Sequence, residues 1–473
     1  MEQPSATPCA NCERLQAQVD SLRQQLDALQ VIVAQLQEQL AAARKDSSTS
    51  SKPPSSDVVK PPPPPLPQGQ SKRRPGGQPG HPKHERALFP PEMVTPFLHT
   101  LDACPCCSGE LRRNAHFANI VQQVDFCPPQ LTVEEHTSPE YWCGHCHRGY
   151  YAAMPRHIQK GGLVGPRLTA LIAYLKGVCH ASFSTVRKFL RDVVQVTISR
   201  GQLVKVIAKV STALEGPYQE LLDLLPDEAR LNVDETGHKN NGKLMWTWCF
   251  RAELYTLFKI DPHRSADVLI EVLGREFDGV IGCDCFSAYR RYLRECGVVV
   301  QFCLAHLIRD VKFLCTLPDK AQSGYGERLR EALRELFGVF HRGEQMAAGQ
   351  FQQQLQQARD KVLLVGTTEV PQGRQTQTMA ARLEKHGAAY FTFVTTAGIE
   401  PTNNLAEQAI RFVVIDRHVT QGTRSESGQR WSERIWSVMA SCAQQGSSVW
   451  DYLNAAVGSY FKGEAAPSLL GQG

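Results

Sequence analysis

Acidic side chains follow two short apolar runs that have the composition of buried strands. Asp234 follows "LNV" in the stretch that ends "VDETG", and Asp284 ends the run "GVIGCD". Carboxylates held at strand ends can bind Mg²⁺, which prefers hard oxygen ligands. Asp and Gly also favour turns, so either aspartate alone is compatible with a turn that binds nothing. A metal site therefore requires that the two aspartates meet and that a further acid joins them.

The order of the surrounding elements predicts that the two aspartates do meet. From about Arg230 the hydrophobic period becomes that of strands, and the Asn241-Gly242 pair is a strong signal for a hairpin turn. Three strands are followed by a helix, a strand, a second helix and a last strand that runs into "CLAH". This order resembles the ribonuclease H-like arrangement, in which the ends of the first and fourth strands lie side by side. We expect a catalytic α/β domain of this kind over residues 229–306 and 396–425.

A third acid could come from the helix that begins in "EPTNNLAEQAIR". Asn404 is the expected N-cap, which places Glu407 in the first turn. Three carboxylates from two strand ends and a helix can bind two Mg²⁺ ions about 3.5–4 Å apart, the spacing for in-line phosphoryl transfer. The same pair also fits a variant of the capping box, in which the acid stabilises the helix and binds no metal. If Glu407 is only a cap, Glu400 is the next candidate; Glu235 points to the opposite face of its strand.

The sixteen cysteines include two pairs with the spacing of metal ligands. "CPCC" contains Cys104 and Cys107, and "CGHC" contains Cys143 and Cys146. Two CxxC pairs can supply four thiolates to one tetrahedral Zn²⁺. We therefore expect a structural Zn²⁺ in a small domain over residues 95–155. Possible substitute ligands are Cys106, His145 and His147.

A heptad pattern near the start of the chain predicts a coiled coil, or leucine zipper, over residues 12–42. We expect this segment to join copies of the chain into a homo-oligomer. A helix that packs on its own chain is the alternative. The apolar seam consists of Leu15, Val19, Leu22, Leu26, Leu29, Val33, Leu36 and Leu40.

Residues 46–87 are rich in Pro, Ser and Gly, a composition that predicts a disordered linker without a packed core. The stretch 44–86 carries nine basic and three acidic residues, a net charge of +6, whereas the whole chain carries only +5. Such a segment can lie along DNA phosphates, although a solvated tether fits the pattern equally well. The candidates for phosphate contact are Lys72, Arg73 and Arg74.

Residues 163–225 have a helical pattern, with Ser184 and Ser199 as expected caps. Two capped helices joined by a short turn are compatible with a helix-turn-helix that binds DNA through Arg200 and Lys205. A plain helical bundle is the equally weighted alternative.

Two further helical regions are expected, an insertion over residues 307–395 and a C-terminal region over residues 426–473. A basic run follows Glu407, and contact with the DNA backbone is its favoured use, with a solvated loop as the alternative. The basic candidates in this run are Arg411, Arg417 and Arg424.

Composition limits the class of protein. A chain of 473 residues with 42% hydrophobic content is long enough for several domains with a sizeable core. No stretch approaches the length and apolarity of a membrane span, and the N-terminal residues lack the layout of a signal peptide. We expect a cytoplasmic protein with no membrane partner, in which regularly spaced cysteines bind metal rather than form disulfides.

Several long motifs together resemble one family from nearly end to end. The zipper, "SSKPPSSD", "RRPGGQPGH", the CxxC pairs, "VDETG", "CDCFSAYR", "CLAHLIRD", "EPTNNLAEQAIR" and "GTRSESG" stand in the order typical of bacterial transposases of the insertion-sequence-66 family. The resemblance implies a DDE transposase whose catalytic triad is Asp234, Asp284 and Glu407. It further implies two Mg²⁺ ions, a nucleoid-associated location, transposon ends and target DNA as partners, and a possible need for accessory proteins of the same element. Gln408 departs from the family, which usually has arginine at that position.

Other interpretations remain compatible with the sequence. A DNA-binding relic without catalytic activity would keep the architecture, although all three acids are present. A ribonuclease H-like nuclease would share the acids but has less use for a zipper, zinc-binding cysteines and a long insertion. "CLAH" could supply a Cys303-His306 nucleophile, a less favoured reading beside a metal site.

Overall fold

The computed structural model describes residues 10–43, 45, 49, 89–94, 96, 106–110, 131–143 and 145–471. The predicted linker, apart from Thr49, lies outside these ranges, as do Cys104, Lys72, Arg73 and Arg74. Within the described residues, no helix combines the length and apolarity needed to cross a membrane.

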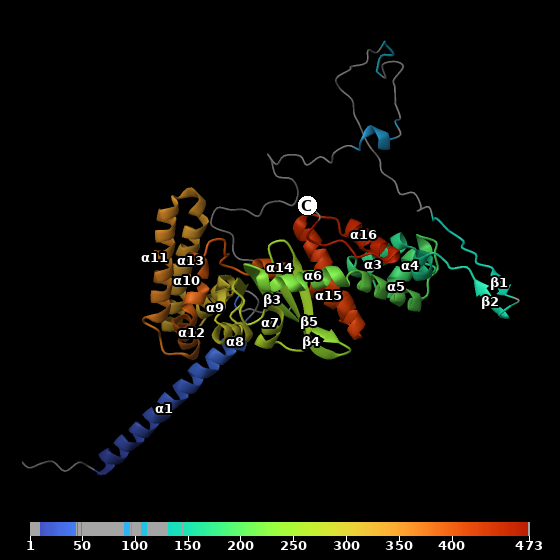
Figure 1. The fold of residues 1–473 in the computed structure, drawn as a ribbon. Coiled ribbons are helices and arrows are strands. Elements are labelled where there is room, and N and C mark those ends of the chain that lie inside the picture. The colour runs from blue at the N-terminus through green and yellow to red at the C-terminus, as the bar shows by residue number, and fades with distance from the viewer. Residues whose placement is uncertain are drawn as a thin grey trace, which may run out of the picture.

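A mixed sheet of five strands forms the centre of the protein (Figure 1). Its strands are β3 (Arg230–Asn240), β4 (Lys243–Arg251), β5 (Thr256–Asp261), β6 (Val280–Cys283) and β7 (Val299–Phe302). Their spatial order is β5-β4-β3-β6-β7, in which β3, β4 and β5 are antiparallel and β6 and β7 run parallel to β3. The first and fourth strands of the sheet are therefore neighbours, as the sequence predicts.

The hairpin between β3 and β4 turns at the residues expected from the sequence. Asn241 and Gly242 both have positive φ, 49° and 80°. A two-residue turn of this kind matches the right-handed twist of the strands that it joins, and Asn-Gly is its preferred sequence.

Helices cover both faces of the sheet. The helices α7 (Ala266–Leu273) and α8 (Ser287–Cys296) connect β5 to β6 and β6 to β7. Tyr289 of α8 donates to the Glu235 side chain, so α8 lies on the face of β3 that carries Glu235. The helix α14 (Asn404–Thr420) packs on β3 and β4, and its N-cap Asn403 bonds to Asn232 on the other face.

The edge strand β5 is covered by α15 (Glu426–Gln445) through side chains rather than by another strand. The backbone N–H groups of Thr256, Phe258 and Ile260 donate to Ser441, Ser437 and Glu433, respectively. Two residues of strand span about 6.8 Å and four residues of helix span about 6.0 Å, so this spacing matches along an antiparallel helix. An unpaired edge can join another chain, and this helix removes that possibility for the outward N–H groups.

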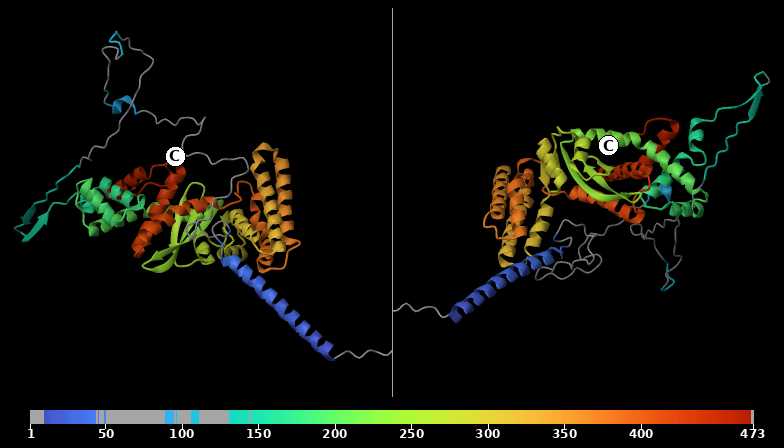
Figure 2. Two further views of the ribbon diagram at one scale, coloured as in Figure 1. Left: turned by 180° about the vertical axis from the view of Figure 1, so that it is seen from behind. Right: turned by 90° about the horizontal axis from the view of Figure 1, so that it is seen from below.

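The insertion after β7 is helical, as expected. It comprises α9 (Leu304–Leu314), α10 (Lys320–His341), α11 (Ala348–Thr367), α12 (Arg374–Tyr390) and α13 (Thr392–Thr395). Figure 2 shows this group at one end of the sheet. One boundary differs from the sequence prediction: the strand ends at Phe302, and "CLAH" begins α9 with Cys303 as its N-cap.

A helical group stands at the other end of the sheet. It consists of α3 (Pro166–Gly177), α4 (Phe183–Asp192), α5 (Arg200–Ala213), α6 (Glu215–Leu224) and the C-terminal α16 (Val449–Lys462), which packs on α3. Ser199 caps α5 as predicted, but α4 is capped by Ser182 and not by Ser184. The connection 193–199 is longer than the tight turn of a helix-turn-helix, so the simpler helical bundle describes this group better.

Two elements extend away from these groups in Figure 1. The helix α1 (Ala10–Ala43) covers the predicted coiled-coil segment, and its seam leucines are exposed, for example Leu22 at 63%. The hairpin of β1 (Glu140–Cys143) and β2 (Arg148–Tyr151) carries the second CxxC pair.

Ser437→Ala should leave the buried N–H of Phe258 without an acceptor, at a cost of about 1–3 kcal/mol in the free energy of unfolding. Hydrogen exchange of the β5 amides should accelerate in the variant, and denaturant unfolding should shift to lower concentration. The matched control is Ser432→Ala on the same helix, where the serine is also buried but has no bond to β5 among those described. Equal exchange at β5 in both variants would show that α15 does not protect the edge in this way.

Candidate active site

The register between β3 and β6 places the two predicted aspartates beside each other. Asn232 pairs with Gly282 in the parallel ladder, so Asp234 and Asp284 each stand two residues beyond a paired position. Because side chains alternate between faces along a strand, both aspartates belong to the face that α14 covers. Fifty residues apart in the chain, they are neighbours in the sheet.

The N-terminus of α14 is fastened to this face by Asn403. Its side-chain amide donates to the carbonyl of Val233 at 2.8 Å and accepts from the amide of Asn232 at 2.9 Å. Its backbone N–H donates to Sγ of Cys303 at 3.2 Å. These bonds tie the start of α14 to β3 and to the end of β7, which fixes where the first turn of α14, with Glu407, can lie.

The capping interpretation of Glu407 is wrong in this structure. The N-cap is Asn403 and not Asn404, so Glu407 is the fourth residue of the helix and not the third after the cap. The backbone N–H of the N-cap, which a capping-box acid would accept, donates to Cys303. The Glu407 carboxylate is therefore free of a capping role.

Negative charge accumulates around Asp234 without a matching cation. Burial raises the pKa of Asp234 well above its usual range, and the charges of Glu235, Asp284 and Glu407 raise it further. The carboxylate accepts one backbone N–H, from Glu235, and Asp284 accepts that of Phe286. Among the described residues, neither aspartate has a Lys, Arg or His within ion-pair distance. A divalent cation would supply the missing positive charge.

Glu235, the other acid of "VDETG", has partners and so differs from its neighbour. Arg264 approaches its carboxylate at 2.6 Å, and the Tyr289 hydroxyl donates to the second oxygen. The Arg264 guanidinium in turn lies over the rings of Trp246 and Phe286. Burial raises the pKa of Glu235 even so, with a contribution from Asp284. This buried network holds β3 against α8, as expected for an acid on the opposite face.

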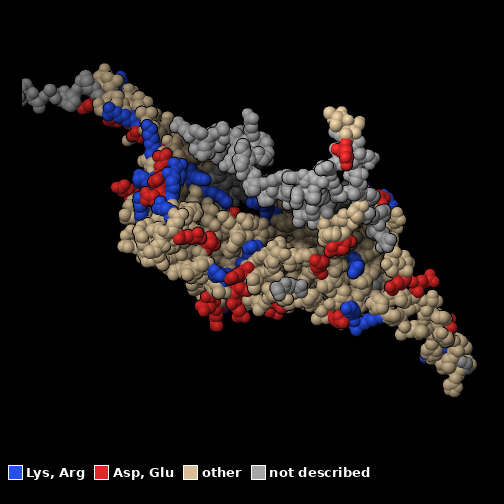
Figure 3. Space-filling view, turned by 90° about the horizontal axis from the view of Figure 1, so that it is seen from above, with Lys and Arg blue, Asp and Glu red and all other residues tan. Residues whose placement is uncertain are grey.

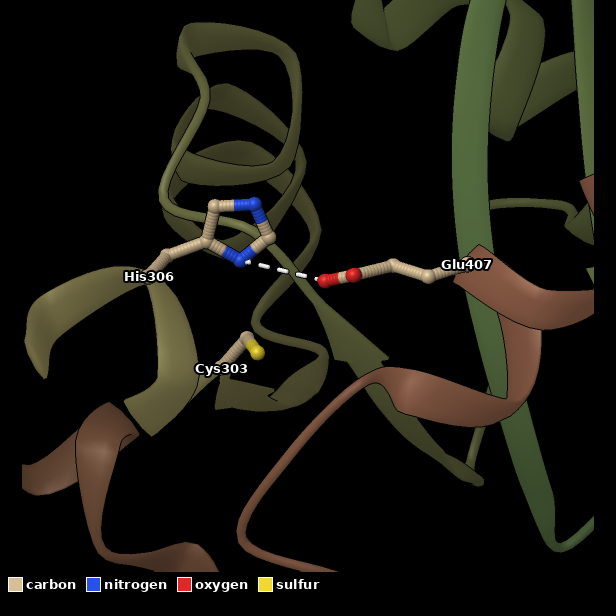
Figure 4. Close-up of side chains that lie close together, drawn as sticks. All are labelled: Cys303, His306 and Glu407. Atoms are coloured by element: carbon tan, nitrogen blue, oxygen red, sulfur yellow. Dashed lines mark ion pairs between the residues drawn. The ribbon is translucent and has the colours of Figure 1, made fainter. Parts of the chain in front are cut away.

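Glu407 is turned toward α9 in this structure (Figure 4). Its Oε1 lies 3.6 Å from Nδ1 of His306, and its Oε2 lies 3.5 Å from the guanidinium of Arg309. The charge of Glu407 contributes to the raised pKa of Asp234, but within the described part of the chain the one group of three metal-type donors with atoms inside 4.8 Å is Cys303, His306 and Glu407. The three predicted acids share one face of the sheet without closing into a single ligand set.

A Cys303-His306 nucleophile finds no support in the geometry. Burial raises the pKa of the Cys303 thiol, whereas a nucleophilic cysteine needs a lowered one. Nδ1 of His306 faces Glu407 and accepts no hydrogen bond from the thiol. The sequence offers "CLAH" as a signal for Cys303 and His306 but does not predict their contact with Glu407, because only the fold connects this motif to a helix a hundred residues later.

The predicted DNA contacts divide into two groups. Arg417 is not free for phosphate, because its guanidinium donates to Thr236 and to the carbonyl of Gly237 in β3, a correction to the prediction. Burial lowers the pKa of Arg417 accordingly. Exposed side chains remain at Arg200, Lys205, Arg411 and Arg424. Figure 3 shows one face of the molecule, on which Lys and Arg gather most densely at the end formed by the helical insertion.

The second CxxC pair forms a knuckle at the tip of the β1–β2 hairpin. Hydrogen bonds from the backbone of Cys146 and His145, and from the Cys146 thiol, lower the pKa of Cys143. Such a setting favours the thiolate that zinc binds. Cys107 lies in a turn at residues 106–107, apart from this knuckle, and Cys104 lies outside the described residues.

Comparisons with known proteins agree with this architecture. The model of "Transposase IS66 family" matches residues 161–430, and that of "zinc-finger binding domain of transposase IS66" matches residues 102–147. A family of unknown function, DUF6444, matches residues 1–87. The "Uncharacterized protein y4qI" of Sinorhizobium fredii is 24% identical over 371 residues, which cover 70% of this chain and 66% of that relative.

The resemblance noted in the sequence is thus confirmed by a family model that covers more than half of the chain, including both aspartates, Glu407 and the complete five-stranded sheet. The separate zinc-finger match contains all four cysteines of the CxxC pairs. This chain belongs to the IS66 family of transposases.

Proposed function

We propose that the protein is a metal-dependent DNA transposase that cleaves transposon ends and joins them to target DNA. The observation that carries this proposal is the placement of Asp234 and Asp284 side by side on a buried sheet, with Glu407 on the helix that covers the same face. In the first step water attacks the phosphodiester at the transposon end and the bond to the 3′ oxygen breaks. The freed 3′-hydroxyl then attacks a phosphorus atom of the target strand, and the bond from that phosphorus to the target's own 3′ oxygen breaks, so no covalent intermediate with the protein is needed.

The chemistry of the donor set fits Mg²⁺. The three acids supply only hard oxygen atoms, and the aspartates stand without a cationic partner among the described side chains. Asp234, Asp284 and Glu407 would hold two ions, which when bound activate the attacking oxygen and stabilise the leaving one. In the present arrangement the Glu407 side chain must turn away from His306 to join the aspartates. We propose that the Glu407 side chain turns in this way when metal and DNA bind.

The chain's own residues position these acids. Asn403 holds the first turn of α14 on β3, and the Glu235–Arg264–Tyr289 network holds β3 on α8. Because the aspartates follow paired positions of a parallel ladder, their backbone is fixed before any ligand binds. The strand order β5-β4-β3-β6-β7 supports assignment to the ribonuclease H-like class, with the helices α9 to α13 as an insertion.

The remaining regions have supporting roles in this proposal. Cys104, Cys107, Cys143 and Cys146 bind one structural Zn²⁺, an assignment supported by the family match and by the Cys143–Cys146 knuckle. The exposed apolar seam of α1 joins two copies as a coiled coil, which would pair two transposon ends. Exposed Arg200, Lys205, Arg411 and Arg424 contribute contacts to DNA phosphates.

Asp234→Asn should stabilise the protein in the absence of divalent cations. The pKa of Asp234 is raised in the folded state, so ionisation of this carboxyl opposes folding as the pH rises from its unfolded pKa through its folded pKa. Asparagine removes the charge and can still accept the Glu235 N–H. In EDTA at neutral pH the variant should unfold on the order of a few degrees higher than the wild type.

Mg²⁺ should narrow this difference, because it stabilises the wild type more than the variant. The control is Glu400→Gln, which removes an exposed acid outside α14. This variant should have the melting temperature of the wild type both in EDTA and in Mg²⁺. A variant that melts below the wild type in EDTA would show that Asp234 is satisfied without a cation.

The function itself is tested by strand cleavage on DNA that carries the element's own ends. Asp234→Asn, Asp284→Asn and Glu407→Gln should each lower the Mg²⁺-dependent rate by roughly 10³-fold or more, because each removes a charged ligand. Double variants should be hardly slower than single ones, since the three acids act as a unit. DNA binding in a mobility-shift assay should stay near that of the wild type.

The same Glu400→Gln variant is the matched control for cleavage and should cut at the normal rate. Cleavage by Glu407→Gln at the normal rate would show that Glu407 is not the third catalytic acid, and Glu400 would become the next candidate. Failure of the wild type to cleave, with DNA binding intact, would instead favour the inactive DNA-binding relic.

A further inference from the structure

Three side chains with different donor atoms converge beside the carboxylate cluster. Cys303 is the N-cap of α9, His306 lies in the first turn of α9, and Glu407 lies in the first turn of α14. A sulfur, a nitrogen and an oxygen from these residues all lie within 4.8 Å of one another. Figure 4 shows the imidazole and the carboxylate facing each other, with the thiol next to them.

The contact between His306 and Glu407 is not a hydrogen bond. Nδ1 of His306 and Oε1 of Glu407 are 3.6 Å apart, and both atoms are buried with no hydrogen-bond partner. Zn–S bonds of about 2.3 Å and Zn–N or Zn–O bonds of about 2.0–2.1 Å set the ligand atoms of a tetrahedral site roughly 3.5 Å apart. Buried polar atoms normally have partners, and this pair has instead the spacing of two ligands to one ion.

The donor types indicate which cation would fit. A thiolate, a neutral imidazole and one carboxylate suit Zn²⁺, whereas Mg²⁺ prefers oxygen alone. Nδ1 of His306 faces Glu407 and has no hydrogen-bond partner, so its lone pair can bind the ion in the tautomer that is protonated at Nε2. The thiol proton of Cys303 would leave as the metal binds.

We propose that Cys303, His306 and Glu407 form a binding site for Zn²⁺ that shares Glu407 with the Mg²⁺ site and therefore inhibits DNA cleavage when occupied. The inhibitory part rests on the proposed function, and the binding part does not. Glu407 cannot face α9 and the aspartates at once. Zn²⁺ would hold it in the orientation seen here, away from Asp234 and Asp284.

Neighbouring groups fit this arrangement. The N–H of Asn403 donates to Sγ of Cys303, a bond that supports a metal-bound thiolate and orients it. Cys303 also stands at the N-terminus of an eleven-residue helix, where the dipole favours negative charge. Arg309 lies near Oε2 of Glu407, so Oε1 is the oxygen left for the ion and binding would be through one oxygen. Three protein ligands leave a fourth position for water.

Binding is tested with Co²⁺ as the probe, on full-length protein whose zinc content has first been measured by elemental analysis. A cobalt ion bound to a thiolate has a charge-transfer band in the near ultraviolet. We expect the band to saturate with one added equivalent in the wild type and to disappear in Cys303→Ser. His306→Gln should weaken cobalt binding at least about tenfold. Both variants are checked for folding by circular dichroism.

The matched control is Cys179→Ser, which removes an exposed thiol outside the cluster and should leave the band unchanged. Asp284→Asn should also keep the band, so the site is measured independently of catalysis. A band of equal strength in the wild type and Cys303→Ser would arise from other cysteines and would overturn the site, as would the absence of a band in the wild type.

Inhibition is measured as the ratio of Mg²⁺-dependent cleavage rates with and without added Zn²⁺, within each variant. In the wild type we expect added Zn²⁺ to lower the cleavage rate at least tenfold. In Cys303→Ser the ratio of the two rates should stay near one. Cobalt binding without any Mg²⁺-dependent cleavage would overturn the proposed function and leave the site in place. Equal inhibition of the wild type and of Cys303→Ser by Zn²⁺ would overturn the proposal that the Zn²⁺ site and the Mg²⁺ site share Glu407.

Discussion

The parallel pairing of β3 with β6 is the constraint on which the candidate site depends. With Asn232 opposite Gly282, Asp234 and Asp284 must leave adjacent strands on the same face, and a shift of one residue would send one of them to the face of α8. Gly282 helps to set this register, because a Cβ there would come within 2.6 Å of the Asn232 amide. Asn232 in turn bonds to Asn403, so the same contact that holds the strands also holds the helix with the third acid.

The candidate site gathers buried carboxylates whose mutual repulsion destabilises the folded protein. Glu235 is a buried acid with a structural role, and its carboxylate accepts hydrogen bonds from Arg264 and Tyr289. Asp234 receives a single backbone N–H and lies next to three other acids, an arrangement that costs stability and is typical of functional sites. Glu407 faces His306 and Arg309 in this structure, and the proposed function requires its side chain to turn toward the aspartates.

Much of this arrangement follows from the sequence, and the rest depends on contacts between distant segments. Hydrophobic period and the Asn241-Gly242 turn predict the strands, and strand order alone brings Asp234 to Asp284. The sequence predicts Asn404 as the N-cap of α14, one residue too late, because Asn403 and Asn404 have the same propensity and only the bonds of Asn403 to β3 distinguish them. The basic run predicts that Arg417 contacts DNA, but its partner lies in β3, 180 residues earlier. The contacts of α15 side chains with β5 and of His306 with Glu407 also join distant segments, so the sequence does not predict them.

The central claim is that Asp234, Asp284 and Glu407 together bind catalytic cations when DNA is present. The most direct measurement is anomalous diffraction from crystals of the protein with a transposon-end DNA and Mn²⁺ in place of Mg²⁺. We expect manganese peaks between the two aspartates, with the Glu407 side chain turned from His306 toward them. Manganese peaks remote from both aspartates, or a Glu407 that stays against α9 while the aspartates hold the ions, would contradict it.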